Sequence, residues 1–273
     1  MDCGGVACGA PREVIAVYEA SDSEVRLDLR VERQGAMRER FGAGSFGLAA
    51  TRVLDVVVAF VVLLLLSPLI AVLMLAIKLE SAGPCFYRCR RVGRNGRELR
   101  MLKFRKMRSD AAGVSLTAPD DERFTRLGTF LAASKVDELP QLWNVLRGEM
   151  SLVGPRPESP EFVDHAASDY AVILTVRPGI TGLSQLAFAR ESEILDDSDR
   201  VGDYLGRLLP AKARIDRLFV ERRSFSLYVR ILVWTLVAVV LRRHVAVNRE
   251  TASMNLRRRA LVEVPTAGMS VSR

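Results

Sequence analysis

A long apolar run over residues 53–79 limits more than any other feature how this chain can fold. Asp55 and Lys78 are its only charged residues. As one continuous helix the run would be about 40 Å long, enough to cross a hydrocarbon core of about 30 Å. A single transmembrane helix is therefore the simplest interpretation of its length.

Ser67 and Pro68 interrupt this run and favour a different arrangement. Proline removes a backbone hydrogen bond and kinks or breaks a helix at a cost of about 3 kcal/mol. The legs on either side, 53–66 and 69–79, would each be roughly 15–20 Å long, too short to cross alone. Basic residues flank both ends, which by the positive-inside tendency places both ends in the cytoplasm. These flanking residues are Arg38, Arg40, Arg52, Lys78, Arg88, Arg90 and Arg91. We therefore expect a re-entrant membrane helix over 53–79.

Residues 137–148 have the pattern of a short helix with two acidic residues at its start. Asp137 suits the N-cap, Glu138 and Pro140 suit the first turn, and Gly148 suits the end. Capping and complementation of the helix dipole are ordinary reasons for such a pair, the cap being worth about 0.5–2 kcal/mol. From spacing alone, this structural role is the commoner explanation.

Four short blocks accompany this acidic pair. They are Lys-Phe-Arg at 103–105, Asp-Glu-Leu-Pro-Gln at 137–141, Gly-Pro-Arg-Pro at 154–157 and Pro-Gly-Ile-Thr-Gly at 178–182. Together with the broken apolar run, they resemble the bacterial sugar transferase family, the small monotopic phosphoglycosyl transferases, over about residues 49–242. One block alone would be unspecific, whereas four in the family's order make the resemblance specific. It implies a re-entrant helix broken at Ser67 and Pro68.

The resemblance also implies a reaction. Enzymes of this family transfer a sugar-1-phosphate from a nucleoside diphosphate sugar, here expected to be a UDP-sugar, to membrane polyprenyl phosphate. The products are a polyprenyl-diphosphate-sugar and a nucleoside monophosphate, in the first membrane step of polysaccharide or glycoconjugate synthesis. By the family's motif, Asp137 is the nucleophile that forms a covalent phosphosugar-aspartate, and Glu138 is the Mg²⁺ ligand. The implied location is the cytoplasmic face of the bacterial inner membrane.

Lys103, Arg105, Lys135 and Arg156 are the candidate substrate-binding residues. The prolines beside Arg156 fix backbone angles, which lowers the entropy lost in holding its guanidinium against a phosphate. A plain turn with an exposed arginine is the structural alternative. For the basic residues around 103–105, the alternative is a solvated edge or contact with lipid headgroups.

The sequence departs from the family's pattern in places. Ala132 stands where many members have an arginine, and Lys135 lies three residues away, so we expect it to restore the lost charge. Thr51 replaces a lysine before the apolar run. Tyr228 stands where an acidic residue is usual, although Asp216 is retained. These changes leave open a catalytically weakened membrane scaffold or regulator with the same fold.

The expected fold class is α+β and mainly helical, in a monotopic membrane protein. Residues 1–47 form an N-terminal extension with short strands over 13–18 and 24–31, and residues 48–243 form the transferase domain. A β-hairpin is expected over 85–104, with Asn-Gly as its turn. Residues 227–241 suit an amphipathic helix at the membrane interface, or a core helix. The basic tail 244–273 is expected to be flexible.

The net charge of +8 fits either phosphate or an anionic lipid surface, and nucleic acid equally well. We expect no nucleic-acid partner, because the chain shows no known reading module and only 7% aromatic residues. Membrane lipids are an expected partner, in addition to the UDP-sugar and the polyprenyl phosphate. The four cysteines have no neighbouring histidine or second pair, so free thiols are expected rather than a zinc site.

Overall fold

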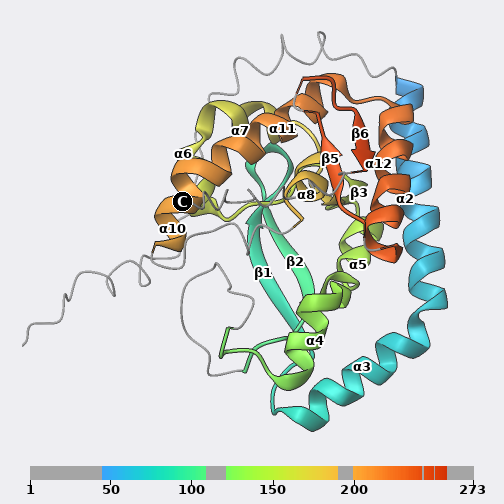
Figure 1. The fold of residues 1–273 in the computed structure, drawn as a ribbon. Coiled ribbons are helices and arrows are strands. Elements are labelled where there is room, and N and C mark those ends of the chain that lie inside the picture. The colour runs from blue at the N-terminus through green and yellow to red at the C-terminus, as the bar shows by residue number, and fades with distance from the viewer. Residues whose placement is uncertain (1–44, 109–120, 190–198, 242, 249, 257–273) are drawn as a thin grey trace, which may run out of the picture.

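The computed structural model describes residues 45–108, 121–189, 199–241, 243–248 and 250–256. The strands expected over 13–18 and 24–31 lie outside these residues. The described part is mainly helical, with three two-stranded sheets, which confirms the α+β class. A long bent pair of helices runs along one side, and a β-hairpin runs beside it (Figure 1).

The apolar run forms two helices, α2 (Ser45–Leu65) and α3 (Ser67–Glu80), which meet at a bend (Figure 1). Pro68 lies in the first turn of α3, where its missing N–H costs no helical hydrogen bond. The Ser67 hydroxyl donates to the carbonyl of Leu64 at 2.8 Å, which satisfies an acceptor at the end of α2. The predicted break at Ser67 and Pro68 is therefore present.

The expectation that neither leg could cross a bilayer alone is wrong for the first leg. Helix α2 starts at Ser45 rather than Val53, and the added stretch includes the good helix formers Leu48, Ala49, Ala50 and Arg52. Within the described residues, one helical stretch, Gly47–Leu65, is long and apolar enough to cross a membrane by length and composition.

Polar contacts fix the first half of α2 to the rest of the protein. The Arg52 guanidinium donates to the carbonyls of Val145 and Leu146 at 2.8 and 3.1 Å. The buried carboxylate of Asp55 accepts from the Leu152 N–H at 2.7 Å and from the hydroxyls of Ser151 and Tyr228. These two charged residues therefore bind α2 to protein partners along its first turns.

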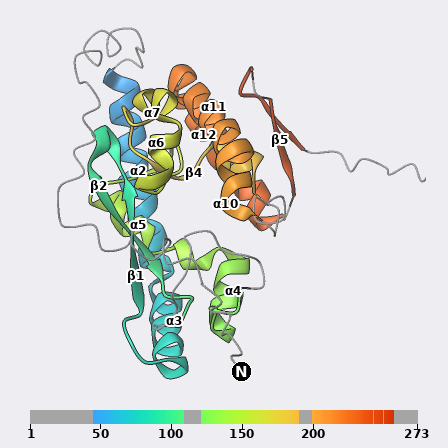
Figure 2. The ribbon, with the colours of Figure 1, turned by 90° about the vertical axis from the view of Figure 1, so that its left-hand side faces the viewer.

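The hairpin consists of β1 (Phe86–Val92) and β2 (Glu98–Phe104), paired antiparallel. Its turn has Asn95 and Gly96 at φ 58° and 73°, the left-handed values that an Asn-Gly turn favours. The tip is held by a hydrogen bond from the Asn95 N–H to the Leu174 carbonyl. The hairpin was correctly predicted, and Figure 2 shows it from the side.

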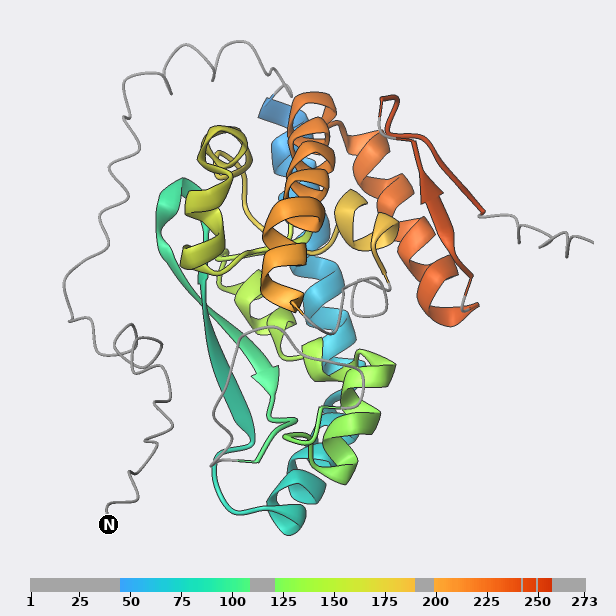
Figure 3. The ribbon, with the colours of Figure 1, turned by 60° about the vertical axis from the view of Figure 1, so that its left-hand side comes forward.

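The centre of the molecule is built from short elements. They are α4 (Arg126–Ser134), a 3₁₀ turn η3 (Val136–Glu138), α5 (Gln141–Leu146), β3 (Ser151–Val153) and β4 (Gly179–Thr181). Strands β3 and β4 pair in parallel. Around them lie α6 (Pro160–His165), α7 (Ala167–Ile173), α8 (Leu183–Ala187), α10 (Arg200–Asp203), η4 (Tyr204–Leu208) and α11 (Leu209–Arg222), visible in Figure 3.

Helix α12 (Phe225–Val240) combines the two alternatives for the second apolar segment. Its first turns carry Leu227 and Ile231, which are buried in the main hydrophobic core. Its later turns expose Val233, Leu236 and other large apolar side chains. The helix therefore has a core end and an exposed apolar end.

The expectation of a flexible tail from residue 244 is wrong for the described residues 245–248 and 250–256. Strands β5 (Val245–Val247) and β6 (Met254–Leu256) form an antiparallel pair, with Val245 and Met254 buried in the main core. The turn is stabilised because the Asn248 side chain accepts from two following backbone N–H groups. Apolar burial thus orders a segment that its polar and basic neighbours made look unstructured.

Candidate active site

The acidic pair lies in the turn η3, between α4 and α5. Lys135 ends α4 with φ 60°, and Pro140 immediately precedes α5, which starts at Gln141. Asp137 is therefore not an N-cap, and that prediction is wrong. It is nevertheless only 2% exposed. A buried carboxylate that caps no helix needs another source of stabilisation, because burial of an unpaired charge is costly.

Two cations on separate elements contact Glu138. Lys103 Nζ from β2 lies 2.9 Å from Glu138 Oε1, and an Arg156 Nη from the loop after β3 lies 3.3 Å from the same oxygen. Burial by itself would raise the pKa of Glu138, but the charges of Lys103 and Arg156 outweigh it and hold this pKa well below its ordinary value. Glu138 is therefore an anion throughout the neutral range.

Lys106 forms an ion pair with the other carboxylate, that of Asp137. It was not among the site residues predicted from the sequence. Its Nζ lies 3.7 Å from Asp137 Oδ2 and 5.2 Å from the centre of the Phe124 ring. Burial lowers the pKa of Lys106, Asp137 opposes this, and the charge of Lys103 adds to the lowering. The signal in the sequence was spacing: Lys106 follows Lys103 by three residues, just beyond the end of β2.

Two glycines position the arginine turn. A Cβ on Gly179 would lie 2.1 Å from the nitrogen of Gly154, so the two backbones approach closely enough to exclude any side chain. Two hydrogen bonds join the strands here, from Gly154 N–H to the Thr181 carbonyl and from Gly179 N–H to the Pro155 carbonyl. The blocks 154–157 and 178–182 are thus one packed unit, with Arg156 extending toward Glu138.

The structure does not bring Arg105 to the acidic pair. Its guanidinium is buried and donates to the carbonyls of Ser81 and Ala82 at 2.7 and 2.6 Å, just beyond the end of α3. Arg105 thereby connects the broken apolar helix to the end of β2. Lys135 is exposed and makes no direct contact with Glu138 within the described residues, although its charge contributes to lowering the pKa of that carboxylate.

A second buried charged group adjoins the arginine turn. Lys212 Nζ and the Tyr204 hydroxyl each lie 2.9 Å from Glu158 Oε1, two residues after Arg156. The nearby Asp216 is also buried, and burial raises its pKa to about 7, against the opposing effects of Ser184 and Lys212. These side chains fix α11 against the segment that carries Arg156.

The donor set suits Mg²⁺ only in a mode shared with substrate. Within the described residues, no three His, Cys, Asp or Glu side chains form a group that could hold a metal ion. Glu138 Oε1 is engaged by two cations, whereas the structure gives its Oε2 no hydrogen bond or ion pair to a described residue. Mg²⁺ is commonly held by one or two carboxylates together with substrate phosphates. Glu138 fits that role.

The broken apolar helix, the hairpin and the buried acidic pair surrounded by cations define a class of protein. The sequence model of the family described as bacterial sugar transferase matches residues 46–242, more than half of the chain. The chain belongs to this family, as the motifs predicted.

Three curated relatives illustrate the similarity. A UDP-glucose:undecaprenyl-phosphate glucose-1-phosphate transferase of Caulobacter vibrioides is 47% identical over 140 residues, covering 50% of this chain and 52% of that protein. An enzyme of the same name from Xanthomonas campestris pv. campestris is 36% identical over 203 residues, covering 72% of this chain and 40% of that protein. Exopolysaccharide production protein PSS of Rhizobium leguminosarum bv. phaseoli is 35% identical over 208 residues, covering 71% of this chain and 97% of that protein. The chain thus spans about half or less of the two named transferases, and nearly all of the Rhizobium protein.

Proposed function

We propose that this chain transfers a sugar-1-phosphate from a UDP-sugar to polyprenyl phosphate, as an early membrane step of polysaccharide synthesis. The observation that carries the proposal is the buried pair Asp137 and Glu138, surrounded by Lys103, Lys106 and Arg156. The names of the relatives give the same substrates, a UDP-sugar and undecaprenyl phosphate. The Rhizobium relative's name supports the link to exopolysaccharide.

In the first step, an Asp137 carboxylate oxygen attacks the phosphorus that carries the sugar. A new O–P bond forms, the bond to the nucleoside monophosphate breaks, and that nucleotide leaves with the bonding electron pair. In the second step, a phosphate oxygen of the polyprenyl phosphate attacks the same phosphorus and releases Asp137. Two anions must meet in each step, so neutralising charge is the main requirement.

The three cations meet that requirement. Lys106 lies beside Asp137 and reduces the repulsion between this carboxylate and an incoming phosphate. Lys103 and Arg156 both contact Glu138 through Oε1, so Oε2 would be the oxygen available to a Mg²⁺ ion shared with substrate phosphates. Mg²⁺, held by Glu138 and the substrate, would supply further neutralisation of the diphosphate charge.

A re-entrant membrane helix fits the contacts of α2 and α3. Arg52 and Asp55 bind one end of the pair to the domain, and Arg105 binds the other end. The apolar side chains between them remain exposed, and a continuous group of exposed apolar side chains marks a contact with a membrane or another protein. These residues are Val53, Val56, Val57, Phe60, Val61, Leu64, Leu65, Leu69, Val72, Leu75 and Leu79. We propose that the helix pair dips into the inner membrane from its cytoplasmic face.

Accessibility labelling tests this topology. Exposed Ala49 lies near the start of α2, and exposed Ala82 follows the end of α3. In a background without native cysteines, Ala49→Cys and Ala82→Cys should both react with an impermeant thiol reagent in inside-out vesicles, and neither in right-side-out vesicles. Reaction of the two positions from opposite sides would show a helix that spans the bilayer.

Release of nucleoside monophosphate tests the activity. Purified full-length protein is incubated with a panel of UDP-sugars, undecaprenyl phosphate and Mg²⁺. The wild type should release UMP, and Asp137→Asn should not. The matched control Asp164→Asn removes one exposed carboxylate from α6 and should release UMP at the wild-type rate. Lack of UMP release with every donor in the panel would instead favour the non-catalytic scaffold.

A further inference from the structure

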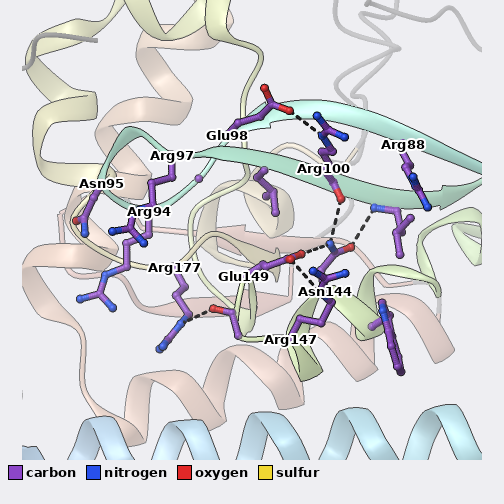
Figure 4. A pocket seen from close by; sticks show the side chains of 15 residues that line it. Arg88, Arg94, Asn95, Arg97, Glu98, Arg100, Asn144, Arg147, Glu149 and Arg177 are labelled. Carbon is purple, nitrogen blue, oxygen red and sulfur yellow. Dashed lines mark hydrogen bonds and ion pairs between the residues drawn. The ribbon is translucent and has the colours of Figure 1, made fainter. Parts of the chain in front are cut away.

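A pocket separate from the acidic pair lies along the hairpin. It has a volume of about 680 Å³ and lies between β2, the hairpin turn, α5 and the segment before β4 (Figure 4). This volume is within the range of pockets that hold small ligands, about 300–1,000 Å³. Six of its fifteen lining residues are arginines: Arg88, Arg94, Arg97, Arg100, Arg147 and Arg177.

The alternation of β2 separates this pocket from the proposed catalytic residues. Side chains of successive strand residues point to opposite faces. Lys103 contacts Glu138. The preceding residue, Leu102, lines the pocket instead, together with Arg88, with which it pairs on β1. Neither member of the acidic pair lines the pocket, nor does Arg156. Strand β2 therefore lies between the cations that contact Glu138 and the arginines that line the pocket.

Two of the arginines have acidic partners in the pocket. Arg100 pairs with Glu98 at 2.9 Å, and Arg147 pairs with Glu149 at 3.0 Å. These contacts neutralise the two glutamates that line the pocket.

The other four arginines have no ion pair with any residue that the structure describes. Arg94 and Arg177 each donate through Nε to a backbone carbonyl, of Thr175 and Gly148 respectively, which fixes their guanidinium groups. Burial lowers the pKa of Arg177, and the charges of Arg94 and Arg52 add to the effect. Figure 4 shows Arg94, Arg97 and Arg177 gathered at one end of the pocket and Arg88 at the other.

We propose that this pocket is a second anion site, which binds a phosphate-bearing ligand. Guanidinium groups bind phosphate oxygens through paired, charge-assisted hydrogen bonds, and two of these groups are already oriented by backbone contacts. Arg94, Arg97 and Arg177 lie near one another without an ion-pair partner among the described residues, so an anion bound between them would reduce their mutual repulsion. The phosphate belongs to a soluble phosphate compound or to the headgroup of an anionic phospholipid.

Trp143 provides a reporter for binding, because it lines the pocket and is 51% exposed. The chain has two tryptophans, so Trp234→Phe leaves Trp143 as the single fluorophore. Full-length protein of this background, in neutral detergent and at fixed ionic strength, is titrated with inorganic pyrophosphate. Isothermal calorimetry of the same samples gives the number of sites.

The test variant is Arg88→Gln/Arg97→Gln. Both side chains are exposed and make no hydrogen bond to a described residue, so the fold should be retained. We expect two pyrophosphate sites in the parent, and a loss of affinity of about tenfold or more at one of them in the variant. The matched control Arg214→Gln/Arg222→Gln removes the same charge from exposed positions on α11 and should bind as the parent does. Lys103→Gln/Arg156→Gln should weaken the other site alone.

A second titration with dihexanoyl phosphatidylglycerol below its micelle concentration identifies the source of the phosphate. Stronger binding of pyrophosphate indicates a soluble ligand, and stronger binding of the lipid indicates a headgroup, in each case provided that Arg88→Gln/Arg97→Gln weakens it. The proposal is overturned if neither probe binds, or if the test variant and the α11 control bind alike. These outcomes do not depend on sugar-phosphate transfer, because no donor sugar or polyprenyl phosphate is present.

Discussion

Lys103 Nζ lies 2.9 Å from Glu138 Oε1, in a contact that joins β2 to the turn between α4 and α5. Both side chains are largely buried, at 14% and 15% exposure. Removing one partner of such a pair leaves a buried charge without compensation. This lowers stability by more than the intact pair contributes to it. The contact therefore fixes both the position and the charge state of Glu138.

Replacing Lys103 by Met should raise the pKa of Glu138, since its principal cation is lost. The acid limb of the pH profile of kcat/KM should move to higher pH, and kcat/KM at neutral pH should fall by about tenfold or more. Lys103→Arg keeps the charge and should leave the acid limb in place. An unchanged acid limb in Lys103→Met would show that this contact does not control the ionisation of Glu138.

Lys135 allows charge and backbone strain to be separated. It has a left-handed backbone, with φ 60°, which costs a non-glycine residue about 1–2 kcal/mol. Lys135→Gly should raise the free energy of unfolding by about 1 kcal/mol, yet lower UMP release by about tenfold because a charge near Glu138 is lost. Thermal unfolding measures the change in stability, and the steady-state rate of UMP release by the same preparations measures the change in activity.

The same position tests whether Lys135 replaces the family's missing arginine. Lys135→Ala should cost far more activity than Ala132→Arg, which adds a cation in the last turn of α4. Wild-type activity in Lys135→Ala would refute this compensation.

Tyr228 acts in the core rather than in the cation cluster. Its hydroxyl donates to the buried carboxylate of Asp55, which joins α12 to α2. Tyr228→Phe should lower the free energy of unfolding by about 1–3 kcal/mol and leave KM for the donor unchanged. In an Asp55→Asn background the same change should cost less, because the two residues interact. Additive losses, or a raised KM, would place Tyr228 in another role.

Asp216 should make stability depend on pH in a direction opposite to most carboxylates. Its pKa rises from the ordinary 3.8 to about 7 in the folded protein. Between these values the native state holds a proton that the unfolded chain has released, so stability falls as pH rises and the fall is complete above about pH 7. The loss is at most about 4 kcal/mol.

Asp216→Asn removes the titrating group and should flatten this dependence. Midpoints of thermal unfolding at pH 5, 6, 7 and 8 should therefore fall more steeply with pH in the wild type than in the variant. Asp164→Asn, at an exposed position, should follow the wild type. Parallel curves for wild type and Asp216→Asn would contradict the raised pKa.

Local signals in the sequence were sufficient for several elements. The Ser67-Pro68 break, the Asn95-Gly96 turn and the packed turns around Arg156 each depend on a residue with restricted or unusual backbone freedom. Such preferences act within a few residues, so the sequence displays them directly.

Contacts between distant segments could not be obtained in this way. Asp55 and Tyr228 are separated by 173 positions, and Lys106 meets Asp137 only after the hairpin and α4 have folded. The helix-start pattern at Asp137 was misleading because Pro140 delays α5 and the left-handed Lys135 ends α4 early. The ordered strands β5 and β6 likewise depend on a core formed by remote residues.

Intact-mass spectrometry of the protein mixed with a UDP-sugar, without polyprenyl phosphate, detects the covalent phosphosugar-aspartate itself. We expect a rise in mass by one glycosyl phosphate, located at Asp137 by peptide mapping, absent in Asp137→Asn and discharged when undecaprenyl phosphate is added. Turnover by Asp137→Asn at the wild-type rate, or wild-type turnover with the adduct on another residue, would contradict it.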